Sequence, residues 1–119
     1  MEAGAQLLIV DDQEGIRELL SDACTMMGYQ VATAASGTEA LNKVKNENYD
    51  VIFVDMKMPG LDGLSTIKQI LQIRPEAKAF LMTGFGEKKI MDDALSCGVK
   101  GIIFKPFDLN QIREMLENF

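Results

Sequence analysis

The stretch VIFVDMKMPGLDG, residues 51–63, is the part of this chain from which its fold can be predicted. Its first four residues form a continuous apolar run, as in strands that are buried on both faces. Asp55 follows directly, and the turn-forming pairs Pro59-Gly60 and Asp62-Gly63 come shortly afterwards. The stretch therefore predicts a buried strand that delivers a carboxylate into a loop. Taken alone, Asp55 is either a turn-forming residue or a reactive group.

The length of 119 residues and the 47% hydrophobic content suit one compact domain, residues 1–119, with a single core. No apolar run approaches the roughly 20 residues that span a bilayer. Residues 1–6 lack the basic start and apolar stretch of a signal peptide, so we expect a cytoplasmic protein without a membrane partner. Cys24 and Cys97 have no CxxC spacing and no histidine beside them, and we expect buried, reduced thiols.

The net charge of −6 is unevenly distributed. Residues 1–60 carry four basic and ten acidic side chains, whereas residues 61–119 carry eight of each. The excess of negative charge therefore lies in the first half. Nucleic-acid binding calls for a basic face, so this distribution argues against it and is compatible with a cation site or a basic partner.

Apolar runs and helical patterns alternate along the whole chain. The strands are expected at residues 6–10, 29–34, 51–54, 77–82 and 101–104, and the helices at 14–27, after Ser36, at 63–73, at 87–96, and from Leu109 to Phe119. Such alternation with short loops predicts an α/β fold, a doubly wound five-stranded parallel sheet with helices on both faces. The expected strand order is 2-1-3-4-5.

The weakest helical pattern is that of residues 87–96. Ile90, Ala94 and Leu95 are expected to form its inward face. Asp108 is expected to cap the last helix.

Polar residues directly follow four of the five predicted strands. They are Asp11 and Asp12 after the first strand, Asp55 after the third, Thr83 after the fourth and Lys105 after the fifth. In a parallel sheet these ends share one edge, where ligands bind near the reversal of strand order. Three carboxylates held close together repel one another unless a cation offsets the repulsion. Oxygen ligands without His or Cys favour a hard ion, so we expect Mg²⁺ held by the three aspartates and the main-chain carbonyl of Lys57.

Each residue also has an ordinary structural explanation. Asp12 could cap a helix, Asp55 could open a turn, Thr83 is common at strand ends, and Lys105 could face solvent. Four independent coincidences would be needed to place all of them at one edge by accident. The set also suits phosphoryl transfer, in which a carboxylate is the nucleophile and an ammonium, a hydroxyl and a metal neutralise the phosphoryl oxygens.

Four motifs resemble the receiver domain of bacterial two-component response regulators: LLIVDDQ at 7–13, VDMKMPGLDG at 54–63, MTG at 82–84 and KPF at 105–107. As a set in this order they are highly specific, and the resemblance covers essentially the whole chain. It implies that Asp55 is the phosphoacceptor and that Asp11 and Asp12 bind Mg²⁺. It further implies that Thr83 is the switch hydroxyl and that Lys105 is the site lysine, followed by a peptide bond to Pro106 that is usually cis in this family.

The resemblance also implies a signalling phosphoacceptor rather than an enzyme. Its partners would be a histidine kinase, whose phosphohistidine donates to Asp55, and a histidine phosphotransfer protein. DDQEGIRELL at 11–20 and FGE at 85–87 are similar to the single-domain regulator of the sporulation phosphorelay, and receivers that precede a sigma-54 activator module are also similar. We expect a monomeric relay protein. The alternative is a receiver taken from a longer regulator with a DNA-binding or sigma-54 activator output module.

Two positions depart from the family pattern. Gly84 stands where Ala or Ser usually follows the switch hydroxyl, which should loosen the loop. Ile102 stands where many receivers carry a Tyr or Phe ring that swings inward on activation. The coupled ring movement is therefore not expected here.

By the same resemblance, the docking surface for partners should include Gln13, Glu14, Gly15 and Arg17 at the start of the first helix, together with the loop after Lys105.

Three other functions were weighed. A nucleotide-binding domain of this architecture needs a glycine-rich turn after the first strand, where this chain has acids. A phosphatase with an aspartyl nucleophile would carry a second acid two residues after it, and Gln13 breaks that spacing. A receiver-like binding module that is never phosphorylated remains an open alternative.

Overall fold

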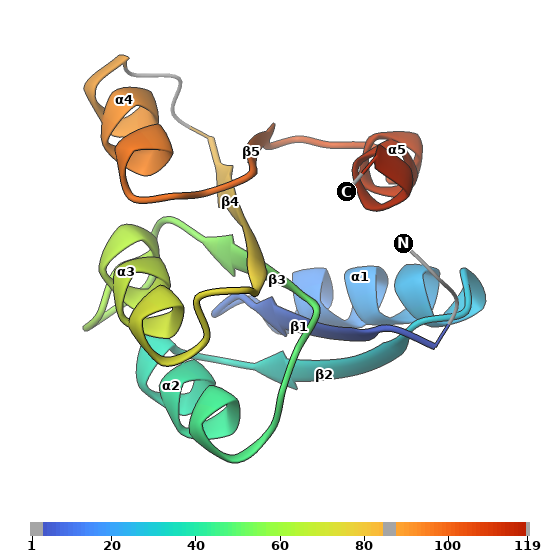
Figure 1. Cartoon of the computed structure of the whole chain (residues 1–119). Coiled ribbons are helices and arrows are strands. Elements are labelled where there is room, and N and C mark those ends of the chain that lie inside the picture. Colours follow the sequence, from blue (N-terminus) through green and yellow to red (C-terminus); the bar gives the residue numbers. More distant parts are fainter. Residues whose placement is uncertain (1–3, 85–87, 119) are drawn as a thin grey trace.

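Five strands alternate with five helices through residues 4–84 and 88–118, the parts of the chain that the computed structural model describes (Figure 1). In chain order the elements are β1 (Gln6–Val10), α1 (Glu14–Met26), β2 (Gln30–Ala34), α2 (Gly37–Asn46), β3 (Val51–Asp55), α3 (Gly63–Ile73), β4 (Lys78–Thr83), α4 (Lys88–Ser96), β5 (Gly101–Phe104) and α5 (Leu109–Asn118). The predicted alternation is confirmed.

The strands form one parallel sheet in the order β2-β1-β3-β4-β5, as predicted. Val10 of β1 lies opposite Ala34 of β2 on one side and Val54 of β3 on the other. The chain moves outward from β1 to β2 and then returns past β1 to β3, so the strand order reverses between β1 and β3. All five carboxyl ends consequently lie at one edge of the sheet, with the reversal near its centre.

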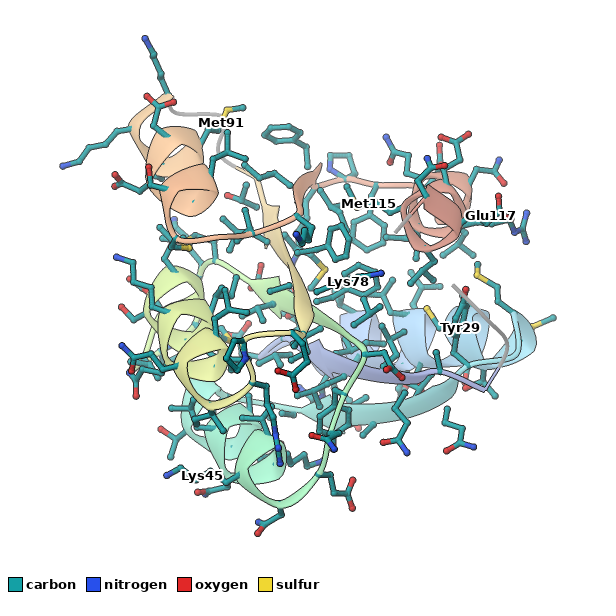
Figure 2. All side chains as sticks on the ribbon, in the orientation of Figure 1. Tyr29, Lys45, Lys78, Met91, Met115 and Glu117 are labelled. Atoms are coloured by element: carbon teal, nitrogen blue, oxygen red, sulfur yellow. The ribbon has the colours of Figure 1, made fainter. Side chains whose placement is uncertain are left out.

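Helices cover both faces of the sheet, α1 and α5 on one face and α2, α3 and α4 on the other (Figure 1). Alternate side chains of β3 point to opposite faces, so Phe53 packs in the α1/α5 layer and Ile52 in the α2–α4 layer. The rings of Phe53 and Phe80 are tilted, with their centroids 5.5 Å apart. Figure 2 shows Met115 of α5 lying over the sheet, whereas Lys45 of α2 points away from it. The sheet thus divides the core into two layers.

The predicted inward face of α4 is wrong in part. Ala94 of α4 is buried and Ile90 is partly buried against the core, but Leu95 is 58% exposed. Ile90 and Ala94 are four residues apart and share one face of the helix, whereas Leu95 is turned about 100° from Ala94. The expected helix start at Glu87 lies outside the described residues.

The cysteines and the last helix follow the prediction with one exception. Cys24 is a buried free thiol, whereas Cys97 is also free but only partly buried, so the expectation of burial is wrong for Cys97. The Asp108 side chain accepts a hydrogen bond from the Gln111 N–H at 2.9 Å and caps α5, as predicted. Phe119 lies outside the described residues.

None of the helices within the described residues is long and apolar enough to cross a membrane.

The start of α3 is packed against the end of β3. The Asp62 carboxylate accepts the Ser65 N–H at 2.8 Å and caps the helix, and the Gly63 N–H donates to the Met56 carbonyl at 2.9 Å. A Cβ atom on Gly63 would lie 2.7 Å from the Met56 Cα and would overlap the Asp55 carbonyl oxygen. A helix can begin this close to Asp55 only because residue 63 has no side chain.

We expect Gly63→Ala to lower the free energy of unfolding by about 1–3 kcal/mol, the usual cost of overpacking. The matched control is Gly15→Ala in α1, where a Cβ atom meets nothing within 4 Å. That change should raise stability by about 0.5–1 kcal/mol, because alanine costs less backbone entropy in a helix. Urea denaturation measures both variants, and equal stability of the two would contradict the close packing at Gly63.

Candidate phosphoryl-transfer and metal site

The structure brings the five predicted strand-end residues to one edge of the sheet. Asp55 and Thr83 are the last residues of β3 and β4, Asp11 and Asp12 directly follow β1, and Lys105 directly follows β5. They meet at a pocket of about 330 Å³ that is lined by Asp12, Gln13, Asp55, Met56, Lys57, Thr83, Gly84 and Lys105. Asp11 is completely buried and contacts the pocket residue Lys105.

Lys105 joins two of the carboxylates. Its Nζ atom lies 2.9 Å from Oδ2 of Asp11 and 3.0 Å from Oδ1 of Asp55. Its main-chain N–H also donates to the Thr83 carbonyl at 2.9 Å, and its peptide bond to Pro106 is cis, as the family resemblance implies. The lysine therefore does not simply face solvent, and its ammonium offsets part of the carboxylate repulsion.

Asp11 is held on several sides. Its second carboxylate oxygen, Oδ1, accepts the Gln13 N–H at 2.9 Å, and its main-chain carbonyl accepts a hydrogen bond from Nη1 of Arg17 at 2.8 Å. Asp12, by contrast, is exposed. Gln13, not Asp12, is the N-cap residue of α1, which removes the helix-capping explanation of Asp12.

The three aspartates form a suitable cluster for a metal ion. Asp11, Asp12 and Asp55 each offer a carboxylate oxygen, and these oxygens lie within 4.8 Å of one another. Carboxylates without nitrogen or sulfur ligands fit Mg²⁺, which usually keeps several waters as well. The donor set therefore fits the ion expected from the sequence.

Burial and ion pairing together determine the pKa values of Asp55 and Lys105. Burial raises the pKa of Asp55 above its ordinary value, and the neighbouring charges of Asp11 and Asp12 add to this, although the hydrogen bond from Lys105 acts in the opposite direction. Burial alone would lower the pKa of Lys105, but its hydrogen bonds to the two aspartates raise that pKa above its ordinary value. Lys105 is therefore protonated at neutral pH, and its ammonium only partly offsets the desolvation of Asp55.

Two contacts of the site had not been predicted. Arg17 was expected on a docking surface, and its hydrogen bond to the Asp11 carbonyl could not be predicted, because a main-chain acceptor is not specified by residue type. The close approach of Gly63 to Asp55 was also missed, although the glycine directly after Asp62 was a visible signal.

Of the two departures from the family pattern, Gly84 lines the site pocket, whereas Ile102 lies within β5 and does not. Ile102 is partly buried against the α2–α4 layer. Gly84 is exposed, and a Cβ atom on it would meet nothing within 4 Å, so space does not require glycine there.

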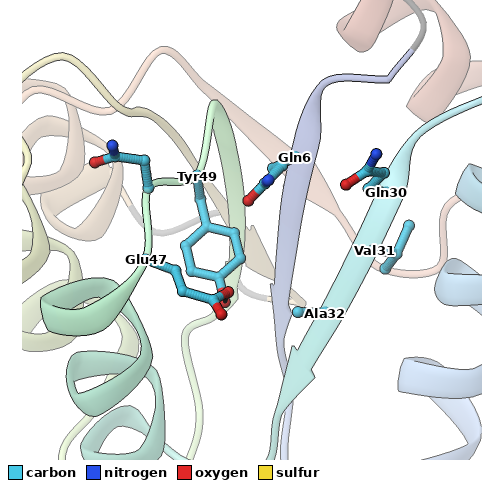
Figure 3. A pocket seen from close by; sticks show the side chains of 7 residues that line it. Gln6, Gln30, Val31, Ala32, Glu47 and Tyr49 are labelled. Atoms are coloured by element: carbon cyan, nitrogen blue, oxygen red, sulfur yellow. Dashed lines mark hydrogen bonds between the residues drawn. The ribbon is translucent and has the colours of Figure 1, made fainter.

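A larger pocket, of about 580 Å³, lies at the opposite edge of the sheet, beside the amino ends of β1 and β2 (Figure 3). Gln6, Gln30 and Tyr49 are among its lining residues, and the Tyr49 hydroxyl donates to the Glu47 carboxylate at 3.2 Å. The smaller pocket is the better candidate site, because it combines clustered carboxylates, a hydroxyl and a partly buried ammonium.

Comparison with known proteins gives related chains of two lengths. Sporulation initiation phosphotransferase F of Bacillus subtilis is 37% identical over 114 residues, which cover 96% of this chain and 92% of that protein. Regulatory protein AtoC of Escherichia coli is 32% identical over 117 residues, which cover 98% of this chain but 25% of that protein. A chain of the solved CheX-CheY-BeF3-Mg+2 complex from Borrelia burgdorferi superposes with a TM-score of 0.92 at 29% identity, covering 98% of this chain and 89% of that one.

We expect Asp55→Asn to stabilise the metal-free fold at pH 7, because the folded environment disfavours the Asp55 charge. Since the pKa of Asp55 is higher in the folded protein than its ordinary value of 3.8, its protonation favours folding. That contribution is complete below pH 3.8 and is lost as pH rises through the folded-state pKa. The gain from Asn should therefore be largest at neutral pH and should vanish below about pH 3.8.

Urea denaturation in EDTA between pH 3 and pH 8 measures this difference. Asp92→Asn, at an exposed position of α4, is the matched control for the loss of one carboxylate. A variant that is less stable than the wild type at pH 7 would show that the ion pair with Lys105 outweighs burial.

The family comparison covers nearly the whole chain. The model of the response regulator receiver domain matches residues 7–117, which include every strand-end residue of the site. The strand order, the acidic cluster and the related chains agree with this match. The chain belongs to the response regulator receiver domain family.

Proposed function

We propose that this receiver domain accepts a phosphoryl group on Asp55 from the phosphohistidine of a histidine kinase and passes it to a histidine phosphotransfer protein. The observation that carries the proposal is the position of Asp55, which lines a pocket beside two further carboxylates and is 3.0 Å from the Lys105 ammonium. Its role is that of a phosphoacceptor in a signalling pathway rather than that of an enzyme that turns over a substrate.

In the forward step, a carboxylate oxygen of Asp55 forms a bond to phosphorus while the bond from phosphorus to the donor imidazole breaks. The product is an acyl phosphate, and the imidazole nitrogen keeps the bonding electron pair and later takes up a proton. The step requires an ionised Asp55, and the ammonium of Lys105 favours that form. The Thr83 hydroxyl is proposed to donate to a phosphoryl oxygen, because Thr83 lines the same pocket.

The proposed Mg²⁺ ligands are Asp11, Asp12, Asp55 and the main-chain carbonyl of Lys57. Both carboxylate oxygens of Asp11 already have hydrogen-bond partners, and one oxygen of Asp55 is paired with Lys105, whereas Asp12 is exposed, so Asp12 is the most accessible of the three carboxylates. The ion supplies positive charge that neutralises the phosphoryl oxygens as they approach the aspartate. A solved complex of the related Borrelia burgdorferi protein contains Mg²⁺, which supports this assignment.

The similar proteins favour the relay role over the control of an output module. The sporulation phosphotransferase is matched over 92% of its length at 37% identity, which supports a protein that passes phosphate onward. The match to one quarter of AtoC supports the second candidate, a receiver that controls an output module. In either role, Ile102 lacks the ring that many receivers rotate on activation, and a relay depends least on that movement.

Partner docking is proposed on the exposed start of α1. Gln13, Glu14 and Gly15 are exposed beside the site pocket, and Gln13 lines it. Leu19, one turn after Gly15, is 48% exposed, which adds apolar area to the same helix face. A partner that covers this face would bring its phosphohistidine to Asp55.

Acetyl phosphate tests the chemistry without a partner. With Mg²⁺, the wild-type protein should gain the mass of one phosphoryl group, and Asp55→Asn should gain none, because the nucleophile is missing. Intact mass spectrometry measures the gain, with Asp92→Asn as the matched control and EDTA as the metal-free arm. Equal labelling of Asp55→Asn, or no labelling of the wild type, would sink the proposed function.

Gly15→Gln tests the docking face separately from the chemistry. A Cβ atom at Gly15 would meet nothing within 4 Å, so we expect the site to stay intact while the docking face is blocked. Transfer from a phosphorylated histidine phosphotransfer protein should slow by about tenfold or more, equivalent to at least about 1.4 kcal/mol. Labelling by acetyl phosphate should stay near the wild-type rate.

Thr25→Gln, at an exposed position near the far end of α1, is the control for that comparison. Unchanged transfer in Gly15→Gln would contradict docking at this face, and an equal loss with both donors would place the effect in the site itself.

A further inference from the structure

Arg17 of α1 reaches back to the main chain at the end of β1. It is partly buried, and its Nη1 atom donates to the carbonyl oxygen of Asp11 at 2.8 Å. Its own N–H donates to the Gln13 carbonyl at 3.1 Å, within the first turn of the helix. Arg17 therefore connects the first turn of α1 to the segment that carries the two acids.

The Asp11 carbonyl lies just beyond the end of β1, where neighbouring strands no longer provide hydrogen-bond donors. Val10 is the last residue of β1, and the Asp11 N–H still donates to the Ala34 carbonyl of β2 at 3.1 Å. The carbonyl of the same residue lies beyond the strand, and Asp11 has no exposed surface. A buried carbonyl that loses its donor is costly, and a charged guanidinium is a strong donor for it.

This carbonyl belongs to the peptide group that joins Asp11 to Asp12. Because a peptide group is planar, a bond that holds its oxygen also sets the direction in which the chain enters Asp12. The Asp11 side chain has partners of its own, the Gln13 N–H and Lys105. The exposed Asp12 is thus positioned largely through its main chain, on which Arg17 acts.

We propose that Arg17 is a positioning residue for the metal site, which orders the peptide between Asp11 and Asp12 before the ion binds. The proposal rests on the Mg²⁺ site of the proposed function and deepens it. A preformed site binds more tightly because the cost of ordering the loop is met during folding. A residue that acted only in partner docking would leave Mg²⁺ affinity unchanged, so the two roles can be separated.

Isothermal titration with MgCl₂ measures the effect in the full chain. Arg17→Gln should raise the Kd for Mg²⁺ by about tenfold, equivalent to about 1.4 kcal/mol, and Arg17→Lys should lie between it and the wild type, since an ammonium can still donate. Labelling by acetyl phosphate should slow in Arg17→Gln at low Mg²⁺ and recover at saturating Mg²⁺. Arg113→Gln is the matched control, because Arg113 is an exposed arginine of α5 far along the chain.

A Kd of Arg17→Gln within about twofold of the wild type would overturn the proposal, whatever happens to transfer from a protein donor. If Arg17→Gln fails to fold, Arg17→Lys decides: a Kd for Mg²⁺ equal to that of the wild type would then overturn the proposal.

Hydrogen exchange of the Gln13 amide in the metal-free protein gives a readout that does not depend on Mg²⁺. This N–H donates to the Asp11 carboxylate, so it should exchange faster in Arg17→Gln and at the wild-type rate in Arg113→Gln. A wild type that binds no Mg²⁺ would refute the metal site of the proposed function. Unchanged exchange in Arg17→Gln would instead refute the ordering role of Arg17.

Discussion

Repulsion among the carboxylates of Asp11, Asp12 and Asp55 is the constraint around which this site is organised. Their oxygens lie within 4.8 Å of one another, and two of the three residues are buried. One ammonium, that of Lys105, bridges two of them, yet burial still raises the pKa of Asp55. A site with this remaining excess of negative charge favours the arrival of a cation, which is the property that phosphoryl transfer to a carboxylate needs.

The parallel sheet makes this crowding possible. Each strand ends at the same edge, so residues that are far apart in sequence, such as Asp11 and Lys105, come within 2.9 Å of each other. The interior of the strands is apolar and buried, and the polar groups of the site occupy only the last positions of the strands or the first positions of the loops. The fold fixes the positions of the functional groups, and residues at the strand ends and in the following loops carry those groups.

The sequence was sufficient for the strand order and for the strand-end residues of the site, because apolar runs mark buried strands and the acids directly follow them. It was insufficient where the outcome depends on packing between elements. Leu95 follows the apolar pattern of α4 but is turned to solvent, and Arg17 bonds to a main-chain oxygen that no residue type announces. The need for glycine at position 63 likewise arises from a backbone that is eight residues earlier in the chain.

The division of the core by the sheet has an evolutionary consequence. The α1/α5 layer and the α2–α4 layer touch each other mainly through the strands between them, so substitutions in one layer share few partners with those in the other. Effects of distant substitutions without shared partners are close to additive. Substitutions in α1, where partner docking is proposed, can therefore accumulate during divergence with stability effects that are nearly independent of those in the α2–α4 layer.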